Sequence, residues 1–388
     1  MNELTIIVDT DYLAYKNLHI AKGFDKNKYH ENNKFFDNPD DMPTFITRMV
    51  TDLSYSLNSF KGYKRVICVK DSKSWRKGIN IPNGSIYKDN RTKSDDINWS
   101  VFYESVNEFL DILEENGIII SRIDNAEGDD LIYLWSNYIL NKEEPDNVLI
   151  LSADSDLSQI VDFNDDVYCV LYDTRQKNNT LIAKNGFNKW LYEKLEEEQE
   201  IDIFNVDIFE KITHKNGVDL IKENLKKLDL HEVNPKEVIL NKIICGDSGD
   251  NIPSIWEWGG IKDNGKFEKR ITNRHYIKLH ENIINNIGEI DIEELRTNTS
   301  FRNRIRLVLQ ENAKTVIESN KFRERLDINT TLVYLNRDII PEEIVEEFDN
   351  NKEALYKRFK TKTIDKNILK NTPYYKSKMG VDESIFDM

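Results

Sequence analysis

Short apolar runs alternate with amphipathic segments along the first half of the chain. Uninterrupted hydrophobic stretches predict buried strands over residues 4–8, 66–69, 117–120, 148–151 and 167–171. Between them, residues 44–57 and 98–116 have the pattern of amphipathic helices. In a third helical segment Leu131, Leu134, Trp135 and Tyr138 fall at i, i+3, i+4 and i+7. This alternation predicts an α/β fold with a doubly wound, mostly parallel sheet.

Acidic residues stand where several of these strands end. Asp9 follows the first strand, Asp71 the second, and Asp154-Ser155-Asp156 the strand at 148–151, while Glu127-Gly128-Asp129-Asp130 opens a helix. Each group alone has an ordinary explanation, since acids favour helix N-termini and aspartate is common in turns. Ligands of open α/β sheets, however, bind at the carboxyl ends of the strands. Carboxylates gathered there would repel one another unless cations lay among them, and hard oxygen ligands favour Mg²⁺ or Mn²⁺ over zinc.

The second half of the chain reads as mainly helical. A third acidic group, residues 246–253, follows an apolar helical segment at 238–245, and its Asp247 and Asp250 are one helical turn apart. We expect four regions: an α/β core over 1–175, a peripheral helical insertion over 176–235, a helical region over 236–345 whose basic stretch, with Lys262 and Lys266, suits DNA binding, and a helical extension and tail over 346–388.

Basic residues concentrate between residues 61 and 93, where ten lysines and arginines face only two aspartates, Asp71 and Asp89. Trp75 and Tyr87 are interleaved with them. The segment has little apolar periodicity, so we expect residues 71–97 to form a basic arch that projects from the core. A charge run is often only a solvated surface, but aromatic residues among the cations also suit contacts with phosphates and bases.

Bulk composition narrows the class of protein. The 388 residues carry a net charge of −15, which disfavours indiscriminate binding to polyanions but permits local basic surfaces. Cys68, Cys169 and Cys245 lie far apart in apolar contexts and lack metal-ligand spacing, so we expect them in the core. Because we find neither a signal peptide nor an apolar run long enough to span a bilayer, we expect a cytoplasmic protein without membrane contact.

Taken in order, these motifs resemble the 5′ nuclease superfamily of flap endonucleases and 5′→3′ exonucleases, and most closely its bacteriophage RNase H branch. The matching pieces are Asp9, Asp71, Trp75-Arg76, residues 87–91, 127–130, 152–157 and 246–253. The resemblance implies a PIN-like core followed by a helix-hairpin-helix-type region. It also implies two or more Mg²⁺ ions, replaceable by Mn²⁺, held by a set of nine acids: Asp9, Asp71, Glu127, Asp129, Asp130, Asp154, Asp156, Asp247 and Asp250. Asp129, Asp130, Asp154 and Asp156 are the expected inner ligands.

The same resemblance assigns further roles. Asp130, Asp154, Lys88 and Arg91 would be catalytic, and the substrate would contact Arg76, Tyr87, Lys88, Arg91, Lys262 and Lys266. The implied activity is removal of RNA primers and DNA flaps from 5′ ends during replication, in the host cytoplasm if the protein is phage-encoded. Substrates would be DNA and RNA–DNA hybrids, with a single-strand-binding protein as a further partner.

Some implications are weaker at the residue level. The loop at 254–262 departs from the family pattern, which affects an expected K⁺ site and the grip on duplex DNA. The acidic-apolar residues 383–388 suit docking to a sliding clamp, or form an unstructured end. Two alternatives to a nuclease stay open: a non-catalytic protein that binds branched DNA on the same scaffold, and a magnesium-dependent phosphatase, which would leave the basic arch unexplained.

Overall fold

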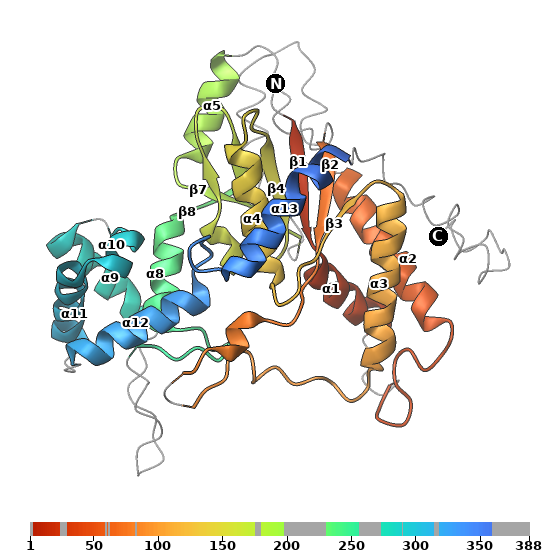
Figure 1. Ribbon diagram of the computed structural model, residues 1–388, viewed down its shortest axis with the longest axis horizontal. Coiled ribbons are helices and arrows are strands. Elements are labelled where there is room, and N and C mark those ends of the chain that lie inside the picture. Colours follow the sequence, from red (N-terminus) through yellow and green to blue (C-terminus); the bar gives the residue numbers. More distant parts are fainter. Residues whose placement is uncertain are drawn as a thin grey trace.

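A computed structural model gives the arrangement of the chain (Figure 1). It describes residues 3–23, 29–58, 60, 63–81, 84–174, 180–197, 230–255, 273–288, 290–313 and 318–358. The expected residues Lys262 and Lys266 and the tail at 383–388 lie outside these ranges.

One eight-stranded sheet forms the centre of the α/β part. Its strands run in the order β3-β2-β1-β4-β6-β7-β8, and β5 pairs with β6 outside this path. The pairs among β3, β2, β1, β4 and β6 are parallel, as expected. The strands span Leu4–Asp9 (β1), Tyr63–Val69 (β2), Ile119–Ser121 (β3), Asn147–Leu151 (β4), Asp162–Phe163 (β5), Tyr168–Asp173 (β6), Thr180–Lys184 (β7) and Leu230–Val233 (β8). Because the strand order reverses between β1 and β4, the carboxyl ends of these two strands flank the switch point where such sheets bind ligands.

Helices cover both faces of the sheet (Figure 1). Successive strand residues point to opposite faces, so Ile6 of β1 packs into one core and Ile7 into another. The first core is closed by α1 (Thr10–Lys22), α2 (Asp41–Asn58), α3 (Trp99–Glu115) and α5 (Phe187–Glu197). The second is closed by α4 (Gly128–Asn141) and α13 (Glu342–Arg358).

The last described helix, α13, is fixed to the first strand by polar contacts. The Tyr356 hydroxyl donates to Asp146 Oδ2 at 2.6 Å and lies 2.9 Å from Thr5 Oγ1. Its ring stacks near Trp135 of α4, and Phe348 packs edge-on against the same indole. Thus α13 belongs to the covering layer of the sheet.

A helical region with its own core lies beside the sheet in Figure 1 and begins with α8 (Pro235–Cys245). Its other helices are α9 (Asn273–Ile287), α10 (Ile292–Thr297), α11 (Thr299–Ala313) and α12 (Ser319–Val333). Ile81 and Tyr87 of the expected arch are buried in this core. The arch is therefore anchored on the helical region, contrary to the expectation that it simply projects. No helix in the described ranges is long and apolar enough to cross a membrane.

The segment at 176–235 also differs from the expectation of a peripheral helical insertion. Its described residues contribute β7 and β8 to the sheet, and α5 packs Phe187 and Leu191 into the first core. The strand β8 was missed because its alternation is weak: His231 and Glu232 are exposed at the edge of the sheet.

Candidate active site

Four aspartates meet at the carboxyl edge of the sheet, and we call them the acidic cluster: Asp9, Asp71, Asp129 and Asp154. Asp9 ends β1 and caps α1, where its Oδ1 accepts a hydrogen bond from the Tyr12 N–H at 3.0 Å. Its Oδ2 accepts from Ser152 Oγ at 2.6 Å. Since β1 and β4 run side by side in parallel, this bond ties the ends of both strands together at the switch point.

Asp71 lies beside the start of α4. Its Oδ1 accepts from the Gly128 N–H, and a Cβ added at Gly128 would lie only 2.7 Å from that oxygen. The Asp71 N–H donates to Asp11 Oδ2 at 2.8 Å, and Asp11 in turn receives a hydrogen bond from Lys70 Nζ at 2.5 Å. The close approach of glycine thus places the Asp71 carboxylate against the first turn of α4, next to Asp129.

The pKa values of these acids show that they share one environment. Burial of the carboxylate raises the pKa of Asp9 to about 6, and the nearby charges of Asp11 and Asp154 add to this rise. The pKa of Asp71 is raised to about 7, first because the surrounding protein desolvates the carboxylate and then because Asp11 is close to it. The residue nevertheless keeps part of its surface exposed to solvent. Burial, followed by Asp154, Asp9 and Asp71, raises the pKa of Asp129 well above its ordinary value. Asp9, Asp71 and Asp154 therefore make Asp129 harder to ionise.

The donor set of the acidic cluster fits hard divalent cations. Bound cations of that kind would offset the burial and the mutual repulsion that raise these pKa values, and carboxylate oxygens are the ligands that Mg²⁺ and Mn²⁺ prefer. Across the described ranges, no three histidine, cysteine, aspartate or glutamate side chains are arranged to hold a metal ion. The fit consequently rests on chemistry and proximity.

Asp130 points away from the acidic cluster and does not agree with its expected role as an inner ligand. Its side chain is 0% exposed and is clamped by Arg76, whose Nη2 lies 2.7 Å from Oδ1 and Nη1 3.0 Å from Oδ2. Trp75 Nε1 donates to the same Oδ2 at 2.9 Å. Consecutive helical residues point in different directions, so Asp129 can face the cluster while Asp130 faces the interior.

Glu127 is likewise held by cations. Arg76 Nη1 lies 2.7 Å from Glu127 Oε2, and Lys88 Nζ lies 2.6 Å from Oε1. Although burial opposes ionisation, Lys88 and Arg76 keep the pKa of Glu127 below its ordinary value. Arg76 itself is 1% exposed and forms ion pairs with Glu127 and Asp130. It is therefore not placed to contact a substrate, which differs from its expected role.

The arch brings further cations to this edge. Lys88, in the left-handed backbone region with φ 57°, donates its N–H to the Asp250 carbonyl at 2.9 Å. Arg91 pairs with the Asp250 carboxylate and keeps 57% of its side chain exposed. Burial raises the pKa values of Asp71 and Asp129, and the Lys88 ammonium opposes both rises, which puts it beside the acidic cluster.

Tyr87 is not positioned for its expected stacking on a base. Its ring is buried in the helical core with 3% exposure, and its hydroxyl lies 3.3 Å from both Glu127 Oε2 and Asp250 Oδ2. Tyr87 therefore links α4 to the loop that carries Asp250.

A second pair of acids borders the cluster. Asp156 and Asp247 are bridged by Lys242 of α8, whose Nζ lies 2.7 Å from Asp247 Oδ2 and also contacts Asp156. Burial and then Asp154 raise the pKa of Asp156 to about 6, despite the opposing Lys242. Asp156 thus connects the acidic cluster to the helical region.

Four residues at this edge were not among the expected site residues: Asp11, Lys70, Ser152 and Lys242. The first three lie within two residues of an expected aspartate in sequence, which was the available signal. Lys242 lies five residues before Asp247 on an apolar helix, and only the fold brings it to Asp156.

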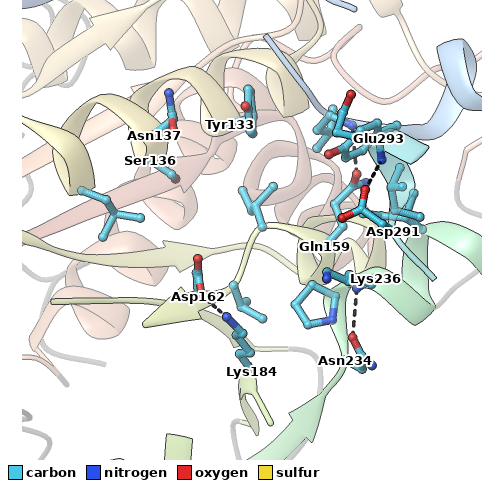
Figure 2. A pocket seen from close by; sticks show the side chains of 18 of the residues that line it. Tyr133, Ser136, Asn137, Gln159, Asp162, Lys184, Asn234, Lys236, Asp291 and Glu293 are labelled. Atoms are coloured by element: carbon cyan, nitrogen blue, oxygen red, sulfur yellow. Dashed lines mark hydrogen bonds and ion pairs between the residues drawn. The ribbon is translucent and has the colours of Figure 1, made fainter. Parts of the chain in front are cut away.

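A separate cavity of about 570 Å³ lies where α4 and β5 meet the helical region (Figure 2). At its wall Lys184 Nζ pairs with Asp162 Oδ1 at 2.6 Å. Gln159 accepts from the Leu335 N–H at 2.9 Å and so joins the two parts of the chain. None of the expected site residues lines this cavity.

Comparisons with known proteins give one family model and several solved structures. Residues 4–194 match the family model described as 5′-3′ exonuclease, N-terminal resolvase-like domain. The flap endonuclease of bacteriophage T5, solved as a variant in a pseudo-enzyme–product complex with DNA and metal ions, is 15% identical over 91% of this chain and 99% of that chain, with a TM-score of 0.45. The T5 5′-exonuclease with bound zinc is 17% identical over 92% and 99%, with a TM-score of 0.47. The catalytic core of Rad2 with a DNA substrate is 13% identical over 86% and 93%, with a TM-score of 0.29. A comparison with curated proteins gave no match.

Proposed function

Because residues 4–194 belong to the 5′-3′ exonuclease N-terminal, resolvase-like domain family, we propose that the chain is a metal-dependent, structure-specific 5′ nuclease. The observation that carries this proposal is the acidic cluster at the switch point, with three pKa values raised and the cations of the arch beside it. A cluster of mutually repelling carboxylates suits phosphoryl transfer, which depends on charge neutralisation and positioning more than on covalent chemistry.

We assign the nine expected acids to different tasks. Asp9, Asp71, Asp129 and Asp154 would hold Mg²⁺, with Mn²⁺ as a substitute, and Asp156 and Asp247 would complete a second position. When bound, two such ions supply charge neutralisation for the phosphate and activate the attacking water. The remaining acids, Glu127, Asp130 and Asp250, would act through their cationic partners.

The cations have distinct tasks in this proposal. Arg91, largely exposed, would bind a backbone phosphate next to the scissile bond. Lys88 would contribute positive charge at the scissile phosphate, and Glu127 would hold its ammonium there. Arg76 would keep Glu127 ionised and would hold both Glu127 and Asp130 in place. Lys262 and Lys266 would contact the duplex.

The substrates we propose are nucleic acids with free 5′ ends, namely DNA flaps and RNA primers in RNA–DNA hybrids, met during replication. A sliding clamp bound through residues 383–388, a single-strand-binding protein and a K⁺ ion in the helical region remain parts of this proposal. The competing function is non-catalytic binding of branched DNA. The raised pKa values in the acidic cluster favour the nuclease, because a protein that only binds DNA gains nothing from buried like charges.

A cleavage assay on a 5′-flapped duplex and an RNA-primed duplex tests the proposal. We expect shortened products only with Mg²⁺, and we expect Asp154→Asn to abolish them while binding persists. Asp165→Asn is the matched control, because Asp165 is exposed on the turn between β5 and β6, outside the cluster. Cleavage that survives both Asp154→Asn and Asp129→Asn would refute the ligand assignment. Binding of both substrates without cleavage by the wild type would support the non-catalytic alternative.

A further inference from the structure

Two aromatic side chains at the start of α3 form a surface beside the acidic cluster. The rings of Trp99 and Tyr103 lie 6.3 Å apart and are tilted by 36°. Both are partly exposed at the rim of the first core. Tyr15 of α1, 38% exposed, lies 6.2 Å from Trp99. Burial and Tyr103 raise the pKa of Tyr15, and the carboxylates of Asp11 and Asp71 raise it further. This group of rings therefore adjoins the carboxyl edge of the sheet.

A cation lies over these rings. Lys93 Nζ is 4.8 Å from the centre of the Tyr103 ring and 5.5 Å from that of Trp99. Lys93 is exposed and has no carboxylate partner within the described part of the chain. Its charge is therefore available to a phosphate, whereas Lys70, 5.8 Å from the Tyr103 ring, is already paired with Asp11.

The chain connects this surface directly to the expected phosphate contacts. Residues 88–99 lead from Lys88 and Arg91 at the acidic cluster to Trp99, along the second leg of the arch that Figure 1 shows running into α3. Trp99 Nε1 donates to the Ser94 carbonyl at 2.9 Å, which fixes the indole relative to that leg. The fixed ring and the free lysine form a small platform of defined geometry.

Packing against the core explains only part of this arrangement. Phe102 fills the core position between the two rings and is fully buried, so hydrophobic packing does not require exposed aromatic faces at Trp99 and Tyr103. Tyr55 of α2 is also exposed, at 71%, but it is not one of the rings that Lys93 covers. Aromatic faces topped by a free cation are the features with which proteins bind single-stranded nucleic acid irrespective of sequence.

We propose that Trp99, Tyr103 and Lys93 bind the unpaired 5′ strand of the substrate, with a base stacked on one of the two rings and its phosphate paired with Lys93. This inference rests on the proposed nuclease function and names the part of the substrate that the site distinguishes. It gives the enzyme a preference for 5′ ends that carry unpaired nucleotides over flush 5′ ends, without preference for the base.

The test compares two 5′-flapped duplexes that differ only in the flap, one of thymidine nucleotides and one of abasic nucleotides. In single-turnover cleavage with Mg²⁺, Trp99→Leu and Tyr103→Leu should each raise the half-saturating protein concentration about tenfold on the thymidine flap. The maximal rate should not change, because the platform does not touch the scissile bond. On the abasic flap the same variants should match the wild type. Tyr55→Leu is the control and should match it on both.

Lys93→Gln separates the phosphate contact from stacking. It should weaken the binding of both flapped duplexes equally and reduce the salt dependence of binding. Equal losses on thymidine and abasic flaps in Trp99→Leu, or no loss on either, would overturn the platform. Fluorescence anisotropy with labelled oligothymidylate and abasic strands makes the same comparison without cleavage. If the wild type cleaves no substrate but binds oligothymidylate more tightly than the abasic strand, and Trp99→Leu loses this difference, the proposed nuclease function fails while the platform is supported.

Discussion

Replacing Gly128 by alanine perturbs one carboxylate of the acidic cluster without touching it chemically. The added Cβ would lie 2.7 Å from Asp71 Oδ1, whereas ordinary contacts begin at 3.4 Å, so the carboxylate must move by about 0.7 Å, the difference between these two distances, to restore ordinary contact. The next atoms, Asp71 Cγ at 3.8 Å and Val69 Cγ2 at 3.9 Å, leave the backbone in place. The strain is thus concentrated on the end of one side chain.

This displacement should separate activity from stability. A misplacement of about 1 Å in a reacting group can cost about 10²-fold in rate, and we expect a loss of that order in Gly128→Ala. The fold should not suffer, because alanine is a better helix former than glycine by up to ~1 kcal/mol and Asp71 can swing toward solvent. The half-saturating Mg²⁺ concentration should also rise, since one ligand is no longer in position.

The assay is single-turnover cleavage of a 5′-flapped duplex over a range of Mg²⁺ concentrations, together with urea unfolding. Gly78→Ala is the matched control, because a Cβ at Gly78 meets nothing within 4 Å. We expect Gly78→Ala to cleave at the wild-type rate. Wild-type cleavage and Mg²⁺ dependence in a folded Gly128→Ala protein would refute the role of Asp71 in the acidic cluster.

Charge balance gives three more expectations. Two carboxyls of the acidic cluster have pKa values of about 6 and about 7, raised above 3.8, so their contribution to stability is complete below pH 3.8 and is lost as the pH rises through 6 and 7. The melting temperature in a chelator should therefore fall between about pH 4 and about pH 7, and the increase in melting temperature on adding Mg²⁺ should grow over that range; an increase that is independent of pH contradicts this. Arg76→Met should destabilise the fold by about 3–5 kcal/mol in urea, because it leaves Asp130 buried without its cation, and adding Asp130→Asn should recover part of the loss. A single variant as stable as the wild type would show that the pair is dispensable. Lys242→Met should lower the half-saturating Mg²⁺ concentration several-fold, since Asp156 and Asp247 lose their resident cation, whereas an increase would mean that Lys242 assists catalysis.

The acids that follow strands could be placed from the sequence alone. Asp9 and Asp154 end neighbouring parallel strands, and a parallel sheet brings such ends to one edge regardless of what the side chains do later. The direction of Asp130 depends instead on Arg76, which lies 54 residues away in sequence and is buried with it. No local pattern distinguishes a basic residue that supports acids from one that meets a substrate.

The sheet shows the same division between local and distant information. Its first strands are continuous apolar runs because both faces are covered by helices. The edge strand β8 alternates weakly and pairs with β7 across a long excursion of the chain, so its register is decided by a distant partner. The anchoring of the arch by Ile81 and Tyr87 was missed for a related reason: two isolated apolar residues have no periodicity to detect.

The position of α13 has a consequence for how the molecule is made. The hydroxyl of Tyr356 meets Thr5 across an interval of 351 residues, and α13 completes the second core, which also contains Trp135 of α4. Almost all of the described chain is therefore synthesised before the second core is complete. Until then the apolar surface that α13 covers is exposed on the nascent protein, where it favours aggregation, and the complete fold can form only when synthesis has passed this helix.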